Sequence, residues 1–187
     1  MDSPKVKVCG VRDADTAGLA ARLGAAYVGM IFAESPRRVS VDEAKFIAAA
    51  AKTPRCEPVG VFGSDSVEDI DSVAKSVGLR IVQLHRRVSA EDVAALRALG
   101  YEVWTLAGGA EGDGVLFDSS HGDGEKAFRK VTGRSILAGG IAAENLPAAL
   151  ALGPDVVDVS GSLESSPGVK DPRRIEDFFA KFNSLAH

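Results

Sequence analysis

The chain has 187 residues and a net charge of −4, with 45% hydrophobic and 26% charged residues, which is typical of one globular domain with a sizeable core. It contains neither a basic cluster nor an apolar run of membrane-spanning length, so neither a nucleic acid nor a membrane is expected as a partner. With two cysteines and no apolar leader, we expect a single domain over residues 1–187 in the reducing cytoplasm.

The first half of the chain alternates between strand and helix patterns. Period-two alternation predicts a strand over Lys5–Cys9, and Asp13 can cap the helix that follows, which Gly24 ends. Uninterrupted apolar runs predict buried parallel strands, and one-sided apolar spacing predicts amphipathic helices. In chain order the next elements are a strand at 27–32, a helix at 41–52, a strand at 58–62, a helix at 67–77 and a strand at 80–85.

The second half continues this alternation with one break. A helix carrying Val93, Leu96 and Leu99 is expected to end at Gly100, but the stretch at 107–113 is too short and glycine-rich for a helix. The other elements are strands at 102–106 and 114–118, a short helix around 126–131, a strand at 135–138, a helix at 145–152, a strand at 155–160 and a final helix carrying Ile175, Phe178, Phe179 and Phe182.

The element count predicts the fold class. Eight strands, nearly all followed by a helix, favour an α/β fold in which the strands close into a (β/α)8 TIM barrel. The barrel is compact, with the helix after the fifth strand missing or replaced by a loop. The alternative is an open doubly wound sheet, but no strand is followed by the G-x-G-x-x-G pattern of its dinucleotide-binding members.

Polar residues and glycines follow the predicted strands. In a TIM barrel these positions meet at one end, where active sites lie. The candidates are Cys9, Arg37, His85, Asp118, Gly139, Gly140, Ser160, Gly161 and Ser162. The loops after strands seven and eight commonly bind phosphate through backbone N–H groups, so the glycine pair and the Ser-Gly-Ser run predict a phosphate site. The alternative is that these glycines only form tight turns.

Cys9 and Asp118 are the candidate acid–base groups. A thiol and a carboxyl across a sugar phosphate suit an isomerisation by proton transfer, provided that the thiol can ionise. The alternatives are that Cys9 packs as a small apolar residue and that Asp118 caps a turn. Three scattered histidines and two cysteines have no metal-ligand spacing, so no metal is expected.

Three further polar residues have less specific roles. Arg37 could hold a carboxylate through two hydrogen bonds, or it could be a solvated loop residue. His85 is interpreted as a supporting residue because the sequence pairs it with no nucleophile. Asp158 lies within an apolar strand, so burial requires that it be hydrogen-bonded, which also favours a supporting role.

These residues, in this order, resemble those of the phosphoribosylanthranilate isomerases, the barrel enzymes of tryptophan biosynthesis. The resemblance extends from about Lys5 to the final helix, and its specificity comes from the ordered set of pieces. The matching pieces are residues 7–10, 29–32, 35–37, 59–62, 82–85, 116–118, 137–141, 145, 158–164 and 167–171.

The resemblance implies a cofactor-free Amadori rearrangement of N-(5-phosphoribosyl)anthranilate to 1-(2-carboxyphenylamino)-1-deoxyribulose 5-phosphate. It implies that Cys9 is the general base that removes the C2 proton and that Asp118 is the general acid that protonates the furanose ring oxygen. It further implies that Arg37 holds the anthranilate carboxylate and that the two glycine loops hold the phosphate. The implied supporting residues are Gln83, His85 and Asp158.

The chain departs from the family pattern at several positions. The loop at 121–124 reads His-Gly-Asp-Gly where the family usually has Gly-Gly-Ser/Thr-Gly. Arg86 stands in place of a common glycine, and Thr105 stands in place of a common lysine. These changes leave the implied acid and base in place.

Two alternative functions stay open at this point. One is a histidine-pathway or bifunctional sugar-phosphate isomerase, but such relatives carry a carboxylate at the position of Cys9. A larger two-phosphate substrate would also need a second phosphate site, for which residues 60–64 are a weak candidate. The other is a non-catalytic barrel that binds a phosphate ligand. The expected partner is a small phosphoribosyl substrate, and the chain is expected to be a monomer or a homodimer.

Overall fold

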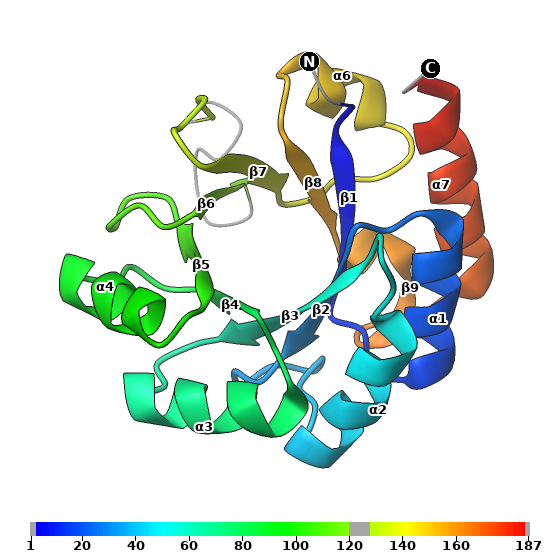
Figure 1. The fold of residues 1–187 in the computed structure, drawn as a ribbon. Helices are drawn as coiled ribbons and strands as arrows, with labels where there is room; N and C mark the ends of the chain where they lie inside the picture. The colour runs from blue at the N-terminus through cyan, green and yellow to red at the C-terminus, as the bar shows by residue number, and fades with distance from the viewer. Residues whose placement is uncertain (1–2, 120–127, 186–187) are drawn as a thin grey trace.

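The computed structural model of the chain describes residues 3–119 and 128–185. Eight parallel strands close into a barrel in the order β1 to β8, and the first strand pairs with the last (Figure 1). The helices lie outside the ring of strands. The predicted (β/α)8 barrel is therefore confirmed, and the open sheet is excluded.

The chain order of the elements follows the expected alternation. The strands are β1 (Lys5–Cys9), β2 (Tyr27–Ile31), β3 (Glu57–Phe62), β4 (Ile81–Leu84), β5 (Glu102–Leu106), β6 (Gly114–Asp118), β7 (Arg134–Ala138) and β8 (Val156–Val159). The helices are α1 (Ala14–Leu23), α2 (Val41–Ala51), α3 (Val67–Val77), α4 (Ala90–Ala98), α6 (Leu146–Ala151) and α7 (Pro172–Leu185). Unpredicted additions are the 3₁₀ helix η2 (Gly161–Leu163) and the antiparallel pair β9 (Glu164–Ser166) and β10 (Val169–Lys170).

Short polar side chains fix where the first four helices begin. Each accepts a hydrogen bond from a backbone N–H group in the first helical turn, which satisfies one of the unpaired donors there. These capping residues are Asp13, Ser40, Ser66 and Ser89. Gly24 and Gly78 end α1 and α3 in the left-handed conformation, at φ of 106° and 80°. The next strands therefore start within a few residues of each helix.

Aromatic and charged side chains fill the N-terminal end of the barrel. The rings of Tyr27 and Trp104 meet edge to face with centroids 4.8 Å apart. The indole Nε1 of Trp104 donates to Glu102 Oε1 at 2.6 Å, and Glu102 also pairs with Arg134. These contacts pack the end of the barrel opposite the one where TIM-barrel active sites lie.

The outer helices pack apolar side chains against the barrel. The predicted face of α7 is buried, and within residues 3–119 and 128–185 no helix is long and apolar enough to cross a membrane. On α4, Val93 and Leu96 are buried, but Leu99 is 46% exposed. The expected end at Gly100 was too late, because the helix ends at Ala98 and Leu99 forms its cap.

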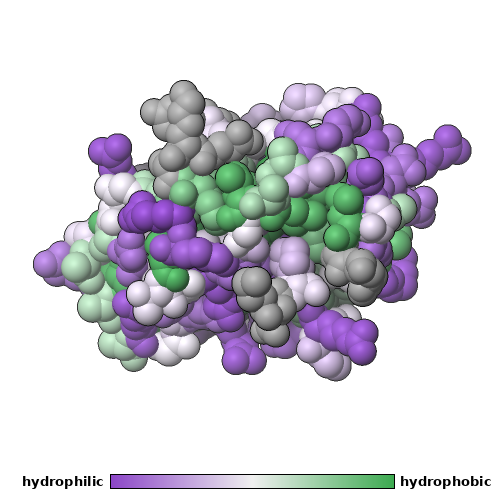
Figure 2. Space-filling model, turned by 90° about the horizontal axis from the view of Figure 1, so that it is seen from above, coloured by the Kyte–Doolittle hydropathy of each residue, from purple (hydrophilic) through white to green (hydrophobic). Residues whose placement is uncertain are grey.

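Large apolar side chains also reach the surface. Figure 2 shows a band of hydrophobic residues among hydrophilic ones on the face seen from above. The large apolar residues that are exposed are Phe46, Leu99, Leu152, Val169 and Leu185. They come from different elements, and isolated exposed apolar residues are normal on globular proteins.

The connection between β5 and β6 contains no helix, as predicted. Its backbone is instead tied to the barrel: the Gly112 N–H donates to Thr105 Oγ1 at 3.0 Å, and the Ala107 N–H donates to the Leu116 carbonyl at 2.9 Å. Thr105 is fully buried. The residue that stands in place of the family lysine therefore supports this short loop.

The prediction of a short helix around residues 126–131 is wrong for the residues of that range that the structure describes. Residues 126 and 127 lie outside the described residues, and residues 128–131 are not helical. Phe128 packs edge to face on Phe117 of β6, and the Val131 N–H donates to Ser135 Oγ at 3.1 Å. These contacts, together with Gly133 just beyond, keep the chain close to the strands instead of in a helical turn.

Candidate active site

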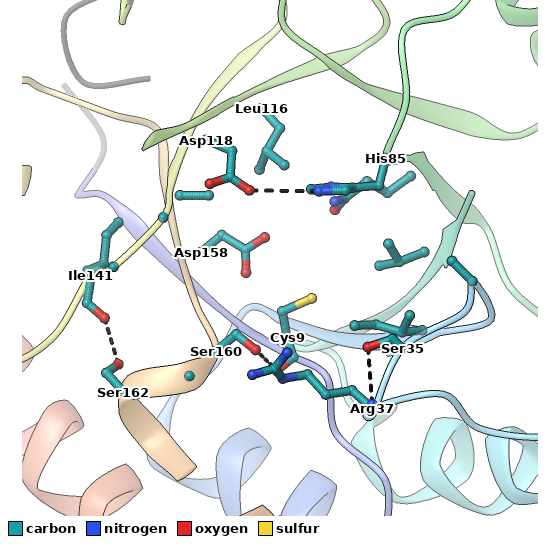
Figure 3. A pocket seen from close by; sticks show the side chains of 18 of the residues that line it. Cys9, Ser35, Arg37, His85, Leu116, Asp118, Ile141, Asp158, Ser160 and Ser162 are labelled. Atoms are coloured by element: carbon teal, nitrogen blue, oxygen red, sulfur yellow. Dashed lines mark hydrogen bonds and ion pairs between the residues drawn. The ribbon is translucent and has the colours of Figure 1, made fainter. Parts of the chain in front are cut away.

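Every residue that the sequence predicts for the site lines one cavity at the C-terminal end of the barrel (Figure 3). This mouth cavity has a volume of about 610 Å³, which suits a small ligand. The predicted residues that line it are Cys9, Arg37, Gln83, His85, Asp118, Gly139, Gly140, Asp158, Ser160, Gly161 and Ser162. The convergence of these side chains is thus a property of the fold, whereas their chemical roles stay predictions.

Cys9 is the last residue of β1, and its carbonyl accepts a hydrogen bond from the Ser160 hydroxyl at 3.1 Å. Its thiol lies across the mouth cavity from Asp118, with Asp158 between them in the view of Figure 3. Burial raises the pKa of the Cys9 thiol, and Lys7 acts in the opposite direction. The buried environment alone therefore favours the thiol over the thiolate that a base requires.

An ion pair between Lys7 and Asp158 lies below the cavity. The two residues are register neighbours across the β1–β8 junction, and Lys7 Nζ lies 2.7 Å from Asp158 Oδ2. Burial lowers the pKa of Lys7, but the attraction of Asp158 and Cys9 outweighs that effect and raises it above the ordinary value. Lys7 is therefore a buried cation at the foot of the site.

Asp118 and His85 face each other from the ends of β6 and β4. The distance from His85 Nε2 to Asp118 Oδ2 is 3.8 Å (Figure 3). Gly139 passes close to this carboxyl, because a Cβ atom at Gly139 would lie 2.6 Å from Asp118 Oδ1. The φ of Gly139, 88°, also disfavours residues with a side chain. Glycine at this position therefore leaves space for the Asp118 carboxyl in the cavity.

Arg37 is held in place by Glu164. Its Nε and Nη2 atoms donate to the two carboxylate oxygens at 2.7 and 2.8 Å. Lys170 Nζ donates to the same carboxylate at 2.8 Å. Burial opposes ionisation of Glu164, but the hydrogen bonds from Arg37 and Lys170 outweigh it and lower its pKa to about 2. Arg37 is thus anchored at the cavity wall, and the alternative of a freely solvated loop arginine is wrong.

The two glycine loops lie side by side at the cavity rim. The Ser162 hydroxyl donates to the Ile141 carbonyl at 2.6 Å, which ties the loop after β8 to the loop after β7. Gly139 and Gly140 have φ of 88° and 67°, and η2 begins at Gly161. Turns of this kind can present backbone N–H groups to an anion, which is the geometry expected of a phosphate site.

Two residues that line the cavity each have a buried side-chain oxygen with no hydrogen-bond partner among the described residues. These oxygens are Gln83 Oε1 and Asp158 Oδ1. Buried acceptors are normally paired in folded proteins. The supporting roles of Gln83 and Asp158 stay predictions.

Sequence reasoning missed Lys7, Glu164 and Lys170. Lys7 was detectable, because it lies two residues before Cys9 and alternation places both on the inner face of the strand. The partnership of Glu164 with Arg37 was not, because it joins residues 127 positions apart through an irregular segment after β8.

The remaining departures from the family pattern lie away from the cavity or outside the described residues. Arg86 donates to the Gly63 carbonyl at 2.9 Å and to Asp92 at 3.2 Å, and so ties neighbouring loops together. The loop at 121–124 lies outside the described residues. Within residues 3–119 and 128–185, no cluster of three or more histidine, cysteine or acidic residues could hold a metal ion.

The family model described as N-(5'phosphoribosyl)anthranilate (PRA) isomerase matches residues 6–181. The chain belongs to this family. The match covers the mouth cavity and all of its predicted residues. The resemblance inferred from the ordered sequence pieces is therefore confirmed.

Individual relatives agree with the family match. N-(5'-phosphoribosyl)anthranilate isomerase from Cereibacter sphaeroides is 36% identical over 208 residues, covering 95% of this chain and 98% of that protein. The crystal structure of the phosphoribosyl anthranilate isomerase from Thermus thermophilus has a TM-score of 0.84 at 31% identity, covering 97% of this chain and 99% of that chain. An isomerase in complex with reduced 1-(o-carboxyphenylamino)-1-deoxyribulose 5-phosphate has a TM-score of 0.82 at 28% identity, covering 97% and 100%.

The ion pair of Glu164 predicts a pH-dependent stability. A carboxyl whose pKa falls from 4.5 to about 2 on folding contributes stability above pH 4.5 that is lost as the pH falls toward 2. The wild type should exceed Glu164→Gln in unfolding free energy by roughly 3 kcal/mol at pH 7. This gap should narrow as the pH falls below 4.5.

Urea unfolding of both proteins between pH 7 and pH 3 measures the gap. The exposed α7 variant Glu176→Gln is the control, and we expect its stability to follow the wild type closely. A gap between wild type and Glu164→Gln that stays constant over this pH range would contradict the assigned ion pair.

Proposed function

We propose that this chain isomerises N-(5-phosphoribosyl)anthranilate to 1-(2-carboxyphenylamino)-1-deoxyribulose 5-phosphate in tryptophan biosynthesis. The observation that carries the proposal is the joint presence of Cys9, Asp118, Arg37 and both glycine loops in one cavity of a chain that belongs to this family. The solved relative in complex with the reduced product analogue also supports a phosphorylated ligand.

The proposed chemistry transfers protons without an oxidant or a cofactor. Asp118 gives a proton to the furanose ring oxygen as the C1–O bond breaks, which leaves a C1–N iminium. The Cys9 thiolate then removes the C2 proton, the C–H electron pair forms a C1–C2 double bond, and the C1–N pair returns to nitrogen. Transfer of a proton to C1, with loss of one from the C2 hydroxyl, gives the ketone. The opposed thiol and carboxyl in Figure 3 suit this division of roles.

Arg37 is proposed to bind the anthranilate carboxylate. Its Nε and Nη2 atoms are occupied by Glu164, and the guanidinium still lines the cavity with 27% of the side chain exposed. A planar guanidinium that is held in one orientation loses little further entropy when it binds a second carboxylate. The glycine loops are proposed to hold the 5-phosphate at the opposite end of the substrate.

The alternative functions have less support. The weak candidate for a second phosphate site at 60–64 contains Gly63, whose N–H already donates to the Asp65 carboxylate at 3.0 Å. A carboxylate at that point opposes phosphate binding and disfavours a two-phosphate substrate. A non-catalytic binding barrel would have no need for the thiol and carboxyl that face each other across the mouth cavity.

Compartment and oligomeric state belong to the same proposal. Cys9 and Cys56 are both free, as expected of a protein in the reducing cytoplasm, which is where we place the chain. We propose that it is a monomer or a homodimer. One solved relative, from Thermotoga maritima, is described as a monomeric form of a dimeric isomerase, so both states occur on this fold.

Substitution of the acid and the base tests the reaction. We expect the wild type to consume the substrate, and Cys9→Ala and Asp118→Ala each to lose at least about a hundredfold in kcat, because each removes one partner of general acid–base catalysis. The measurement is the loss of substrate anthranilate fluorescence. Cys56→Ala, which replaces the cysteine outside the cavity, should keep its activity. Binding of a product analogue by a wild type that never turns over would refute the enzyme proposal.

If Arg37 binds the anthranilate carboxylate, the effect of Arg37→Lys should depend on whether the substrate carries that carboxylate. Arg37→Lys should raise KM for the natural substrate about tenfold or more, because the paired donors are lost while the charge remains. The analogue N-(5-phosphoribosyl)aniline, which lacks the carboxylate, should show little difference between wild type and Arg37→Lys. The exposed neighbour variant Arg38→Lys is the control. An equal rise in KM for both substrates would rule out carboxylate binding by Arg37.

A further inference from the structure

Lys7 and Cys9 share the inner face of β1. Residues two apart on a strand point to the same side, and both side chains are buried. Gly29 on β2 is the register neighbour of Cys9. A Cβ atom at Gly29 would lie 2.9 Å from Cys9 Sγ and 3.1 Å from Lys7 Nζ. The sulfur and the ammonium are thus packed over the same glycine, in space that only a residue without a side chain leaves open.

Asp158 holds the ammonium at this point. It lies opposite Lys7 in the β1–β8 register, and the two groups are joined at 2.7 Å, with 0% of the Lys7 side chain exposed. A buried lysine without a partner tends to lose its proton, whereas one paired with a carboxylate keeps it. Asp158 therefore fixes both the position and the charge of Lys7.

Several charged or titratable groups face Cys9 from the surrounding elements. They are Lys7 on β1, Asp158 on β8, Arg37 after β2, Lys170 on β10 and, across the cavity, His85 and Asp118. Arg37 and Lys170 share the carboxylate of Glu164, which compensates their charges. Lys7 is the cation among these that is packed with the Cys9 sulfur over Gly29.

We propose that Lys7, anchored by Asp158, is a positioning residue that keeps its ammonium against the Cys9 sulfur and stabilises the thiolate that acts as base. During catalysis Lys7 exchanges no proton with the substrate. The thiolate takes the C2 proton and becomes a neutral thiol, and Lys7 and Asp158 keep their charges throughout. Only the catalytic part of this inference rests on the proposed function. The effect of Lys7 on the ionisation of Cys9 can be measured without a substrate.

The ionisation of Cys9 gives a direct test. In a Cys56→Ala background Cys9 is the only thiol, so the rate of alkylation by iodoacetamide against pH reports its thiolate. We expect Lys7→Met to move the midpoint upward by about one pH unit or more, because the nearby positive charge is lost. Lys5→Met is the matched control: it makes the same substitution at an exposed position on the same strand, and its midpoint should not move.

A second variant covers the outcome in which Lys7→Met does not fold. Lys7→Met/Asp158→Asn removes both charges and leaves no uncompensated ion in the barrel. We expect a smaller upward shift of the midpoint in this variant, because the loss of the Asp158 carboxylate acts in the opposite direction to the loss of Lys7. Circular dichroism and thermal unfolding check that the barrel is intact. An unchanged midpoint in whichever of the two variants folds would overturn the proposal.

Kinetics separate this proposal from the proposed function. We expect Lys7→Met to lower kcat about tenfold or more at pH 7, with the loss recovered as the pH rises, because a tenfold smaller thiolate fraction is restored by one pH unit. A merely structural role would lower activity equally at every pH. A shifted midpoint with a wild type that does not turn over would refute the isomerase and leave the role of Lys7 standing. Turnover by the wild type together with an unshifted alkylation midpoint in Lys7→Met would support the isomerase and refute the role of Lys7.

Discussion

The junction between β1 and β8 is the constraint on which the site depends. A parallel barrel closes only where its first strand meets its last, and here Lys7 stands opposite Asp158 in the register and is paired with it at 2.7 Å. Removing one partner of such a buried pair is strongly destabilising, because the other charge is left uncompensated. The same junction brings Ser160 to the carbonyl of Cys9 and places the loop after β8, which is proposed to bind phosphate, beside the thiol. The closure of the barrel and the assembly of the site therefore depend on the same strand junction.

The two ends of the barrel differ in their side chains: the N-terminal end is packed, and the C-terminal end holds the candidate site. Tyr27, Trp104 and the Glu102–Arg134 pair fill the N-terminal end, which leaves the polar side chains to gather around a cavity at the other. At the cavity wall, Glu164 orients Arg37 through two hydrogen bonds. The proposed acid and base are thus carried by strand ends, a placement on rigid elements that suits catalysis.

Much of this arrangement could be predicted from local sequence patterns. The apolar runs and one-sided helices define eight strands, most of them followed by a helix. The rule that strand ends meet at one mouth is then enough to bring Cys9, Asp118 and the glycine loops together. The helix around 126–131 failed in its described part because contacts of Phe128 with β6 outweigh a weak local preference. The anchor of Arg37 could not be predicted, because it depends on the irregular chain after β8, where no periodicity indicates which side chains meet.

Growth of auxotrophic bacteria tests the central claim most directly, because it asks whether the mouth cavity performs this reaction in a cell. The strain requires tryptophan because it lacks its own phosphoribosylanthranilate isomerase. Wild type should restore growth without tryptophan, and Cys9→Ala should not. A histidine-requiring strain that lacks its sugar-phosphate isomerase should stay dependent on histidine. Failure of the well-expressed wild type to restore growth, or equal restoration by Cys9→Ala, would contradict an isomerase that works through a thiol at the end of β1.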